Sequence, residues 1–406
     1  MLTGTNLKYA KAHNQRIVLE TVRLFGPIAR KEIAARTELT LQSVSNITRA
    51  LLKAELIMEA DQLRGGRGAP TSLLALNPTG AFSFGLDFDR EHFLGVLVDQ
   101  SGTVRRRTAR DVYYLMPDEA IELMAGTVVE LMNTDGIDKA RVWGVGIGLP
   151  GPLGKTRDSA VTNVVNPFAF PGWTSVPIVD ALRERLDMPV YIENNALAAA
   201  VGERWYGRGQ HIADFFYLYF GIGLGGGLVL NGRPYDGHRG NAGEIGAAPT
   251  GLRADFNSDS DYLGAYFSVA NLSKRLEPHG VKISRPDEIG PLFDAGHADV
   301  IDWLNAGVRE LAPFILAIEY LLDPDAIFLG GRYSDSVIEY IRERLDSILP
   351  NLRKEDRLAY PRLLCGTAGE EATALGAATL PMYSFMAPSP DVLLKNKEIE
   401  SLSSRI

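Results

Sequence analysis

Short apolar runs alternate with helix-like segments along residues 81–330, and glycine-rich segments follow several of these runs. The apolar runs predict strands at 82–86, 93–98, 142–149, 190–192, 215–220, 228–230 and 326–329. Apolar residues at helical spacing cover 118–132, 176–186 and 300–322. Strands that alternate with helices favour an α/β fold. Because the pattern occurs once before residue 197 and again after it, we expect two lobes with a cleft between them.

Residues 1–77 have a different pattern, in which short helices precede a glycine-rich segment. Apolar spacing predicts helices at 14–25, 30–36 and 41–52. Gly26-Pro27 ends the first helix, and Thr40 is a good N-cap for the third. One face of the third helix is apolar and consists of Val44, Ile47, Leu51 and Leu52.

The opposite face of the third helix carries short polar side chains and an arginine. These residues are Gln42, Ser43, Ser45, Asn46 and Arg49. Such a set can read base edges in a DNA major groove. Arg64 and Arg67 follow on a glycine-rich segment before a strand at 71–76, where a wing would reach a minor groove. The arrangement resembles the winged helix-turn-helix of repressors. The alternative is a small helical protein-interaction domain with a glycine-rich linker.

The charge of the chain is unevenly distributed. Residues 1–77 hold eleven Lys and Arg against six Asp and Glu, a balance of +5, whereas the whole chain carries −8. A basic head on an acidic body indicates that only the head approaches a polyanion such as DNA. The alternative is that +5 is an ordinary solvated surface.

Composition also bears on the compartment. Residues 1–16 lack the apolar core of a signal peptide, and Gly, Pro or charge interrupts every apolar run before it reaches the length of a membrane span. The single cysteine, Cys365, rules out an intrachain disulfide and a cysteine-based metal cluster. We therefore expect a cytoplasmic protein.

An ordered series of motifs in the body is more specific than any one glycine-rich loop. The series reads GVGIGLPGP at 144–152, NP at 166–167, ENNA at 193–196, GIGLGGG at 221–227, GNAGEIG at 240–246 and GGR at 330–332. It resembles the ROK family (repressors, open reading frames and kinases) between residues 81 and 380, and the winged head resembles the repressor branch of that family. The resemblance implies a two-lobed α/β body of the actin and hexokinase type, with sugar in the cleft.

The resemblance also implies a division of the chain. We expect a winged helix-turn-helix at 1–77, a first lobe at 81–196 that a helix near 370–385 completes, and a second lobe at 197–369. The tail at 386–406 carries no motif that we can interpret.

Positions that serve phosphoryl transfer in the family's kinases are altered here. The first phosphate loop usually reads Asp-x-Gly-Gly-Thr, whereas Asp87 is followed by Asp89-Arg90-Glu91, whose carboxylates would oppose nucleotide phosphates. In the second loop Ile222 replaces a hydroxyl residue, and the alternative for the glycines of 221–227 is a tight hairpin.

Asn195 stands where those kinases carry the aspartate that accepts the proton of the sugar hydroxyl. An amide hydrogen-bonds a hydroxyl but is no base at neutral pH. Loss of a general base typically costs about 10²–10⁴-fold in rate. We therefore predict no catalytic residue and no useful kinase activity.

By the same resemblance, four residues occupy sugar-contact positions: Asn166, Asn194, Asn195 and Glu244. Amides and carboxylates suit sugar hydroxyls, because each hydroxyl both donates and accepts hydrogen bonds. The alternative for each asparagine is a turn or cap residue, and for Glu244 a solvated loop carboxylate.

Two departures from the family pattern limit the expected ligand. Ala247 replaces a family histidine, residues 250–264 contain none of the cysteines of the family's zinc loop, and Gly264 replaces a sugar-binding glutamate. Zinc needs four N, S or carboxylate ligands, and we expect the aspartates at 255, 259 and 261 to belong to a polar loop instead of a cation site. We predict no metal and no cofactor. The effector is then an altered sugar, a sugar derivative or absent, and His238 is a candidate compensating contact.

A helix-turn-helix usually binds a two-fold operator as a dimer. Our leading hypothesis is a homodimeric repressor on double-stranded operator DNA, in which a sugar effector closes the lobes and changes operator affinity. The alternatives are an ATP-dependent sugar kinase with a fused DNA-binding head and a constitutive DNA-binding protein with a vestigial body.

Overall fold

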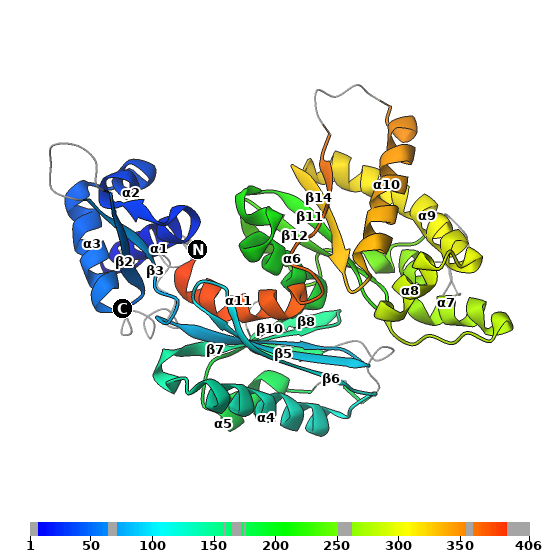
Figure 1. The fold of residues 1–406 in the computed structure, drawn as a ribbon, viewed down its shortest axis with the longest axis horizontal. Helices are drawn as coiled ribbons and strands as arrows, with labels where there is room; N and C mark the ends of the chain where they lie inside the picture. The colour runs from blue at the N-terminus through cyan, green and yellow to red at the C-terminus, as the bar shows by residue number, and fades with distance from the viewer. Residues whose placement is uncertain are drawn as a thin grey trace.

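The computed structural model describes residues 7–63, 71–156, 159–164, 172–173, 176–250, 262–354 and 360–387 (Figure 1). A helical head, drawn in blue, adjoins a body built on two separate five-stranded sheets. No helix within these ranges is both long and apolar enough to cross a membrane.

The head packs three helices against a small antiparallel sheet. Its elements are α1 (Leu7–Phe25), β1 (Ile28–Ala29), α2 (Arg30–Thr37), α3 (Leu41–Lys53), β2 (Ile57–Leu63) and β3 (Thr71–Leu76), with strand order β1-β3-β2. α1 starts earlier than predicted but ends before Gly26-Pro27, as predicted. The Thr40 hydroxyl accepts a hydrogen bond from the Ser43 amide at 3.2 Å, which confirms the predicted cap of α3.

The first sheet of the body has the strand order β10-β7-β4-β5-β6. Its strands are β4 (Phe82–Phe88), β5 (His92–Asp99), β6 (Val104–Asp111), β7 (Val142–Leu149) and β10 (Val190–Asn194). β4, β7 and β10 run parallel, and β5 and β6 add an antiparallel edge. The helices α4 (Pro117–Asp135) and α5 (Ile178–Leu186) pack on one face, and α11 (Ala372–Met386) packs on the other (Figure 1).

The second sheet has the order β13-β12-β11-β14-β15. Its strands are β11 (Phe215–Phe220), β12 (Leu224–Leu230), β13 (Arg233–Tyr235), β14 (Ala326–Gly331) and β15 (Arg362–Cys365). This lobe also contains α7 (Val269–Leu276), α8 (Ile289–Asp294), α9 (Ala298–Leu322) and α10 (Asp335–Leu352). Its core is a continuous apolar cluster that includes Phe267, Trp303 and Tyr333.

Smaller elements join these layers. A hairpin of β8 (Leu153–Thr156) and β9 (Ser159–Val164) follows β7, and α6 (Asn195–Tyr206) follows β10 and packs along α11. Short 3₁₀ turns lie at η1 (Lys139–Arg141), η2 (Arg208–His211), η3 (Ile245–Ala247), η5 (Leu263–Phe267), η6 (Glu277–His279) and η7 (Pro286–Glu288). The strands and helices predicted for the body are all present, several with longer bounds.

Candidate functional site

The candidate DNA-reading face lies on α3, at the edge of the molecule farthest from the second sheet (Figure 1). The apolar face of α3 is buried in the core of the head, as predicted for Val44, Ile47 and Leu51. The polar residues therefore point outward. Gln42, Asn46 and Arg49 are exposed, and the Asn46 side-chain oxygen accepts hydrogen bonds from both Gln42 and Arg49 at 3.4 Å. These three side chains therefore form one polar stripe along the helix.

The remaining residues predicted for DNA contact differ in position. Ser43 and Ser45 are only half-buried, and the Ser43 hydroxyl lies 2.9 Å from the Thr40 hydroxyl at the start of α3. Arg64 and Arg67 lie outside the described residues. Leu41 at the first position of α3 is 53% exposed and was not among the predicted contacts. An exposed apolar side chain beside a polar stripe is suited to contact a thymine methyl group.

A second candidate site lies where the carboxyl ends of β4, β7 and β10 meet. Asp87 on β4 pairs in register with Gly148 on β7, and Gly148 pairs with Glu193 on β10. Ligands of open α/β sheets bind beyond this end of the strands. We call Asp87, Gly151, Asn194, Asn195 and Glu244 the interlobe site.

Asn194 and Glu244 come together although 50 positions separate them. The Asn194 amide donates a hydrogen bond to Glu244 Oε1 at 2.8 Å. A Cβ atom at Gly151 would lie 2.2 Å from this oxygen and 2.3 Å from Asn194 Nδ2, so a side chain at this position would displace the pair. Burial raises the pKa of Glu244. The structure thus joins two of the four predicted sugar contacts in one polar pair.

Asn194 also caps a helix, as the alternative interpretation of this residue proposed. Its side-chain oxygen accepts hydrogen bonds from the Ala196 amide at 2.8 Å and the Leu197 amide at 3.4 Å. Asn195 is the first residue of α6 and is half-buried, and its carbonyl accepts a hydrogen bond from the Thr373 hydroxyl at 3.3 Å. Asn166 lies outside the described residues.

A charged cluster adjoins the interlobe site at the end of β4. Asp87 is 2% exposed; burial raises its pKa to about 7, Arg332 opposes the rise and Asp89 adds to it. Burial, with Arg332, lowers the pKa of His92 to about 4, so the imidazole is neutral at pH 7 although its Nε2 lies 3.9 Å from Asp87. Nucleotide phosphates here would meet the buried carboxyl groups of Asp87 and Asp89.

Arg332 is the residue of this cluster that sequence reasoning did not select as a site residue. It follows the GG pair that ends β14, and its backbone amide donates a hydrogen bond to the Phe220 carbonyl at 2.7 Å. Within the described part of the chain, its Nη1 atom and Asp87 Oδ2 are both buried and have no hydrogen-bond partner. The signal in the sequence was the arginine of the GGR motif.

The glycines of 221–227 form a hairpin, which is the structural alternative considered for them. β11 and β12 pair antiparallel around a turn at 221–223. A Cβ atom at Gly227 would lie 2.7 Å from the Ala196 carbonyl, so the glycine lets β12 approach α6.

The segment that replaces the family's zinc loop was predicted to hold no metal, and some of its residues can be placed. A Cβ atom at Gly264 would lie 2.9 Å from the Gly246 carbonyl, so a glutamate at this position would require the local backbone to shift. His238 is exposed. The aspartates at 255, 259 and 261 lie outside the described residues.

Comparisons with known proteins agree with these observations. A sequence model of the ROK family matches residues 83–382. The xylose repressor of Bacillus spizizenii is 26% identical over 393 residues, covering 93% of this chain and 97% of that protein. The glucokinase of Thermotoga maritima is 26% identical over 321 residues, covering 73% of this chain and 96% of that protein.

A solved structure extends the likeness to the head. A ROK family transcriptional regulator, described as a homologue of the E. coli MLC protein, matches with a TM-score of 0.76 and 21% identity. The match covers 96% of this chain and 100% of the regulator. At this identity the match shows the fold, and it includes the head as well as both sheets.

Proposed function

The chain belongs to the ROK family, and from this premise we propose that it is a sugar-responsive transcriptional repressor that binds its effector without phosphorylating it. The observation that carries the proposal is the amide of Asn195 at the start of α6, beside the Asn194–Glu244 pair. An amide holds a hydroxyl but does not remove its proton at neutral pH. Relatives named xylose repressors that align with nearly the whole chain support the regulatory role.

For DNA we propose a division of labour within residues 1–77. Base edges are read from α3 by Gln42, Ser43, Ser45, Asn46 and Arg49, and the wing residues Arg64 and Arg67 contact the minor groove and backbone. The exposed polar stripe on α3 supports the first assignment. Two copies of the chain bind the two halves of an operator, because one head supplies only a modest interface.

For the effector we propose that Asn166, Asn194, Asn195 and Glu244 hold the hydroxyl groups of one sugar. The hydrogen-bonded Asn194–Glu244 pair supports this grouping. D-xylose is the first sugar to test, because it is the ligand that the names of the relatives suggest.

The test uses the purified full chain with D-xylose, D-glucose and N-acetyl-D-glucosamine. An operator duplex is first selected from a random library with the wild-type protein, and its affinity is then measured with and without each sugar. We expect one sugar to raise the melting temperature, because it binds the folded state, and to change the operator affinity. A protein that binds no duplex selectively, or whose affinity ignores every sugar that raises its melting temperature, would contradict the proposal.

A further inference from the structure

The helix α11 runs from the interlobe site to the DNA-binding head. It has 15 residues and is therefore about 22 Å long. Near its start, the Thr373 hydroxyl donates to the Asn195 carbonyl at 3.3 Å. At its other end, Arg16 of α1 donates to the carbonyls of Ser384 at 2.8 Å and Ala387 at 3.1 Å. Figure 1 shows the helix, in red, along the first sheet, with one end next to the head.

Glycines seat α11 against its neighbours with no room for sliding. A Cβ atom at Gly85 of β4 would lie 1.9 Å from the Ala374 carbonyl, and one at Gly146 of β7 would lie 1.8 Å from that of Ala377. A Cβ atom at Gly202 of α6 would lie 2.3 Å from the Ala372 carbonyl. Close-packed interiors transmit displacement instead of absorbing it. We therefore treat α6, α11 and the first sheet as one rigid body.

Arg16 ties the head to this rigid body. Its side chain is 6% exposed, and both of its hydrogen bonds go to carbonyls at the carboxyl end of α11. Those carbonyls have no partner within the helix, and the end of a helix carries partial negative charge that favours a cation. A buried guanidinium without such partners would be strongly unfavourable. The position of α1 is thus bound to the position of the end of α11.

Apolar packing around Arg16 continues the same connection. Val18, Leu19 and Val22 of α1 belong to one buried cluster with Met382, Phe385 and Met386 of α11. The Phe385 ring lies 4.9 Å from that of Trp143, at the start of β7. The head and the body therefore share one core at this point and do not meet through a flexible tether alone.

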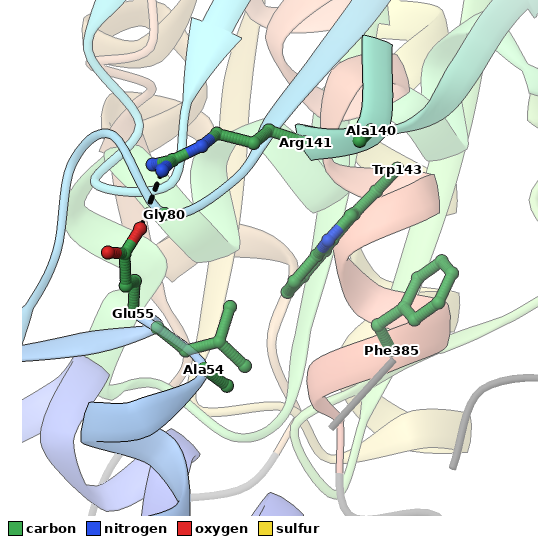
Figure 2. A pocket seen from close by; sticks show the side chains of 8 residues that line it. Ala54, Glu55, Gly80, Ala140, Arg141, Trp143 and Phe385 are labelled. Atoms are coloured by element: carbon green, nitrogen blue, oxygen red, sulfur yellow. Dashed lines mark hydrogen bonds and ion pairs between the residues drawn. The ribbon is translucent and has the colours of Figure 1, made fainter. Parts of the chain in front are cut away.

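The opposite side of the junction is more open. A pocket of about 380 Å³ lies between the end of α3 and the body, with Trp143 and Phe385 on one wall (Figure 2). Arg141 crosses its edge, with Nη2 at 2.5 Å from Glu55 Oε2 and Nη1 at 2.8 Å from the Thr79 carbonyl. On this side the head and the body are joined by the exposed Arg141–Glu55 pair and by a hydrogen bond from the Gln100 side chain to the Leu56 carbonyl at 3.1 Å. The tight contact on one side and the open pocket on the other leave room for the head to tilt about the Arg16 contact.

We infer that α11 carries the state of the interlobe site to the DNA-binding head, and that Arg16 is the positioning residue that couples them. The inference rests on the proposed function. A sugar that displaces the first lobe displaces α11 as a rigid body, and Arg16 converts that displacement into a tilt of the head. A shift of packed helices at an interface is a common route for such switching.

The experiment measures the ratio of operator dissociation constants with and without the sugar that raises the melting temperature most. D-xylose, D-glucose and N-acetyl-D-glucosamine are the sugars used. The wild type is expected to show a ratio in the range of typical allosteric coupling, about 5- to 150-fold. In Arg16→Met we expect the ratio to fall to about 1, because the cap on α11 is lost, while the melting-temperature shift by sugar stays unchanged.

Three further variants separate coupling from folding. Arg16→Lys keeps a cation that can donate to one carbonyl and should retain part of the ratio. Arg36→Met is the matched control, because both contacts of Arg36 lie within the head. Arg36 pairs with Glu32, and its guanidinium lies over the Phe25 ring. It should keep the wild-type ratio. If Arg16→Met does not fold or binds no DNA, Phe385→Leu tests the same joint from the body and should lower the ratio.

The outcomes assign failure to one idea or the other. If no sugar changes the operator affinity of the wild type, the proposed function fails and this inference fails with it. If the wild type responds and Arg16→Met and Phe385→Leu respond equally well, only the inference is overturned. A loss of response in Arg36→Met equal to that in Arg16→Met would also overturn it, because the effect would then be general to the head.

Discussion

Arg16 and Arg332 are buried to a similar degree, at 6% and 8% exposure, but their surroundings differ. Arg16 donates to two carbonyls at the end of α11 and lies beside an apolar core. The charge of Arg332 lowers the pKa of Asp87, and the Arg332 Nη1 atom has no hydrogen-bond partner among the described residues. The Arg16 contact is thus internally satisfied, whereas the interlobe region keeps buried polar atoms that have no hydrogen-bond partner in the described part of the chain. Buried unpaired groups of this kind are typical of sites that take a polar ligand.

The largest expected effect concerns the unpaired acid in the interlobe site. Burial raises the pKa of Asp87 from 3.8 to about 7. An acid whose pKa is higher in the folded state destabilises that state when ionised, so the free energy of unfolding falls as pH rises from about 4 to about 7. Asp87→Asn should therefore stabilise the protein by about 2–4 kcal/mol at pH 8 and by less at pH 5. Urea denaturation at both pH values measures this, and an equal effect at the two would contradict it.

Substitution of Arg16, whose side chain is hydrogen-bonded, should instead lower the free energy of unfolding. Arg16→Met removes two charge-assisted hydrogen bonds and leaves two carbonyls unpaired, so we expect a loss of about 1.5–3 kcal/mol. Arg36→Met breaks an exposed pair and should cost less than about 1 kcal/mol. Chemical denaturation of both variants provides the comparison. If both variants lose the same stability, the buried hydrogen bonds of Arg16 contribute no more than an exposed pair, and the contrast with Arg332 disappears.

Changes on α3 should affect operator affinity without affecting sugar binding at the interlobe site. Arg49→Ala should weaken operator binding by about 1–3 kcal/mol, roughly 5- to 150-fold, and Gln42→Ala by a similar or smaller amount. Neither change should alter the melting-temperature shift caused by sugar, because α3 packs against α1, α2 and β2 within the head. Unchanged operator affinity in a gel-shift titration would overturn the assignment of α3 as the reading helix.

The smallest effect is expected in the wing. Arg67→Ala should weaken binding to all duplexes uniformly and reduce the slope of log affinity against log salt by about 1. Titrations at several salt concentrations measure this slope. A selective loss on the operator with an unchanged slope would instead assign a base contact to Arg67.

The three helices and the strand at 71–76 of the head could be predicted because their signals are local, whereas β1 and β2 were not predicted. The apolar face of α3, the cap at Thr40 and the end of α1 are each encoded within a few residues. Several elements of the body were not predicted, and α7, α8 and α10 of the second lobe are among them. Two others, β6 and α6, were missed for opposite reasons. β6 is an edge strand rich in exposed arginines and lacks an apolar alternation, whereas most of α6 is buried and alanine-rich, and lacks a polar face.

The two candidate sites also differ in how far local sequence signals predict them. The polar stripe of α3 follows from helical spacing alone, but the interlobe site requires residues far apart in the chain. Asn194 and Glu244 were selected because of their motifs, and their contact appears only in the folded structure. The approach of Arg332 to Asp87 spans more than half of the chain, and no spacing rule connects the two. The Arg16 contact with α11 was likewise invisible, because a backbone carbonyl leaves no trace in a sequence.

The most direct test of the account is a search for phosphorylated sugar in a reaction of the wild-type protein with Mg-ATP. It uses the sugar that raises the melting temperature, at a concentration that saturates this shift, and detects the product by mass spectrometry. With Asn195 in place of a base, we predict that the sugar is recovered unchanged at the level of a protein-free control. Sugar phosphate formed over many turnovers would show that the protein transforms what it binds, and would contradict the account.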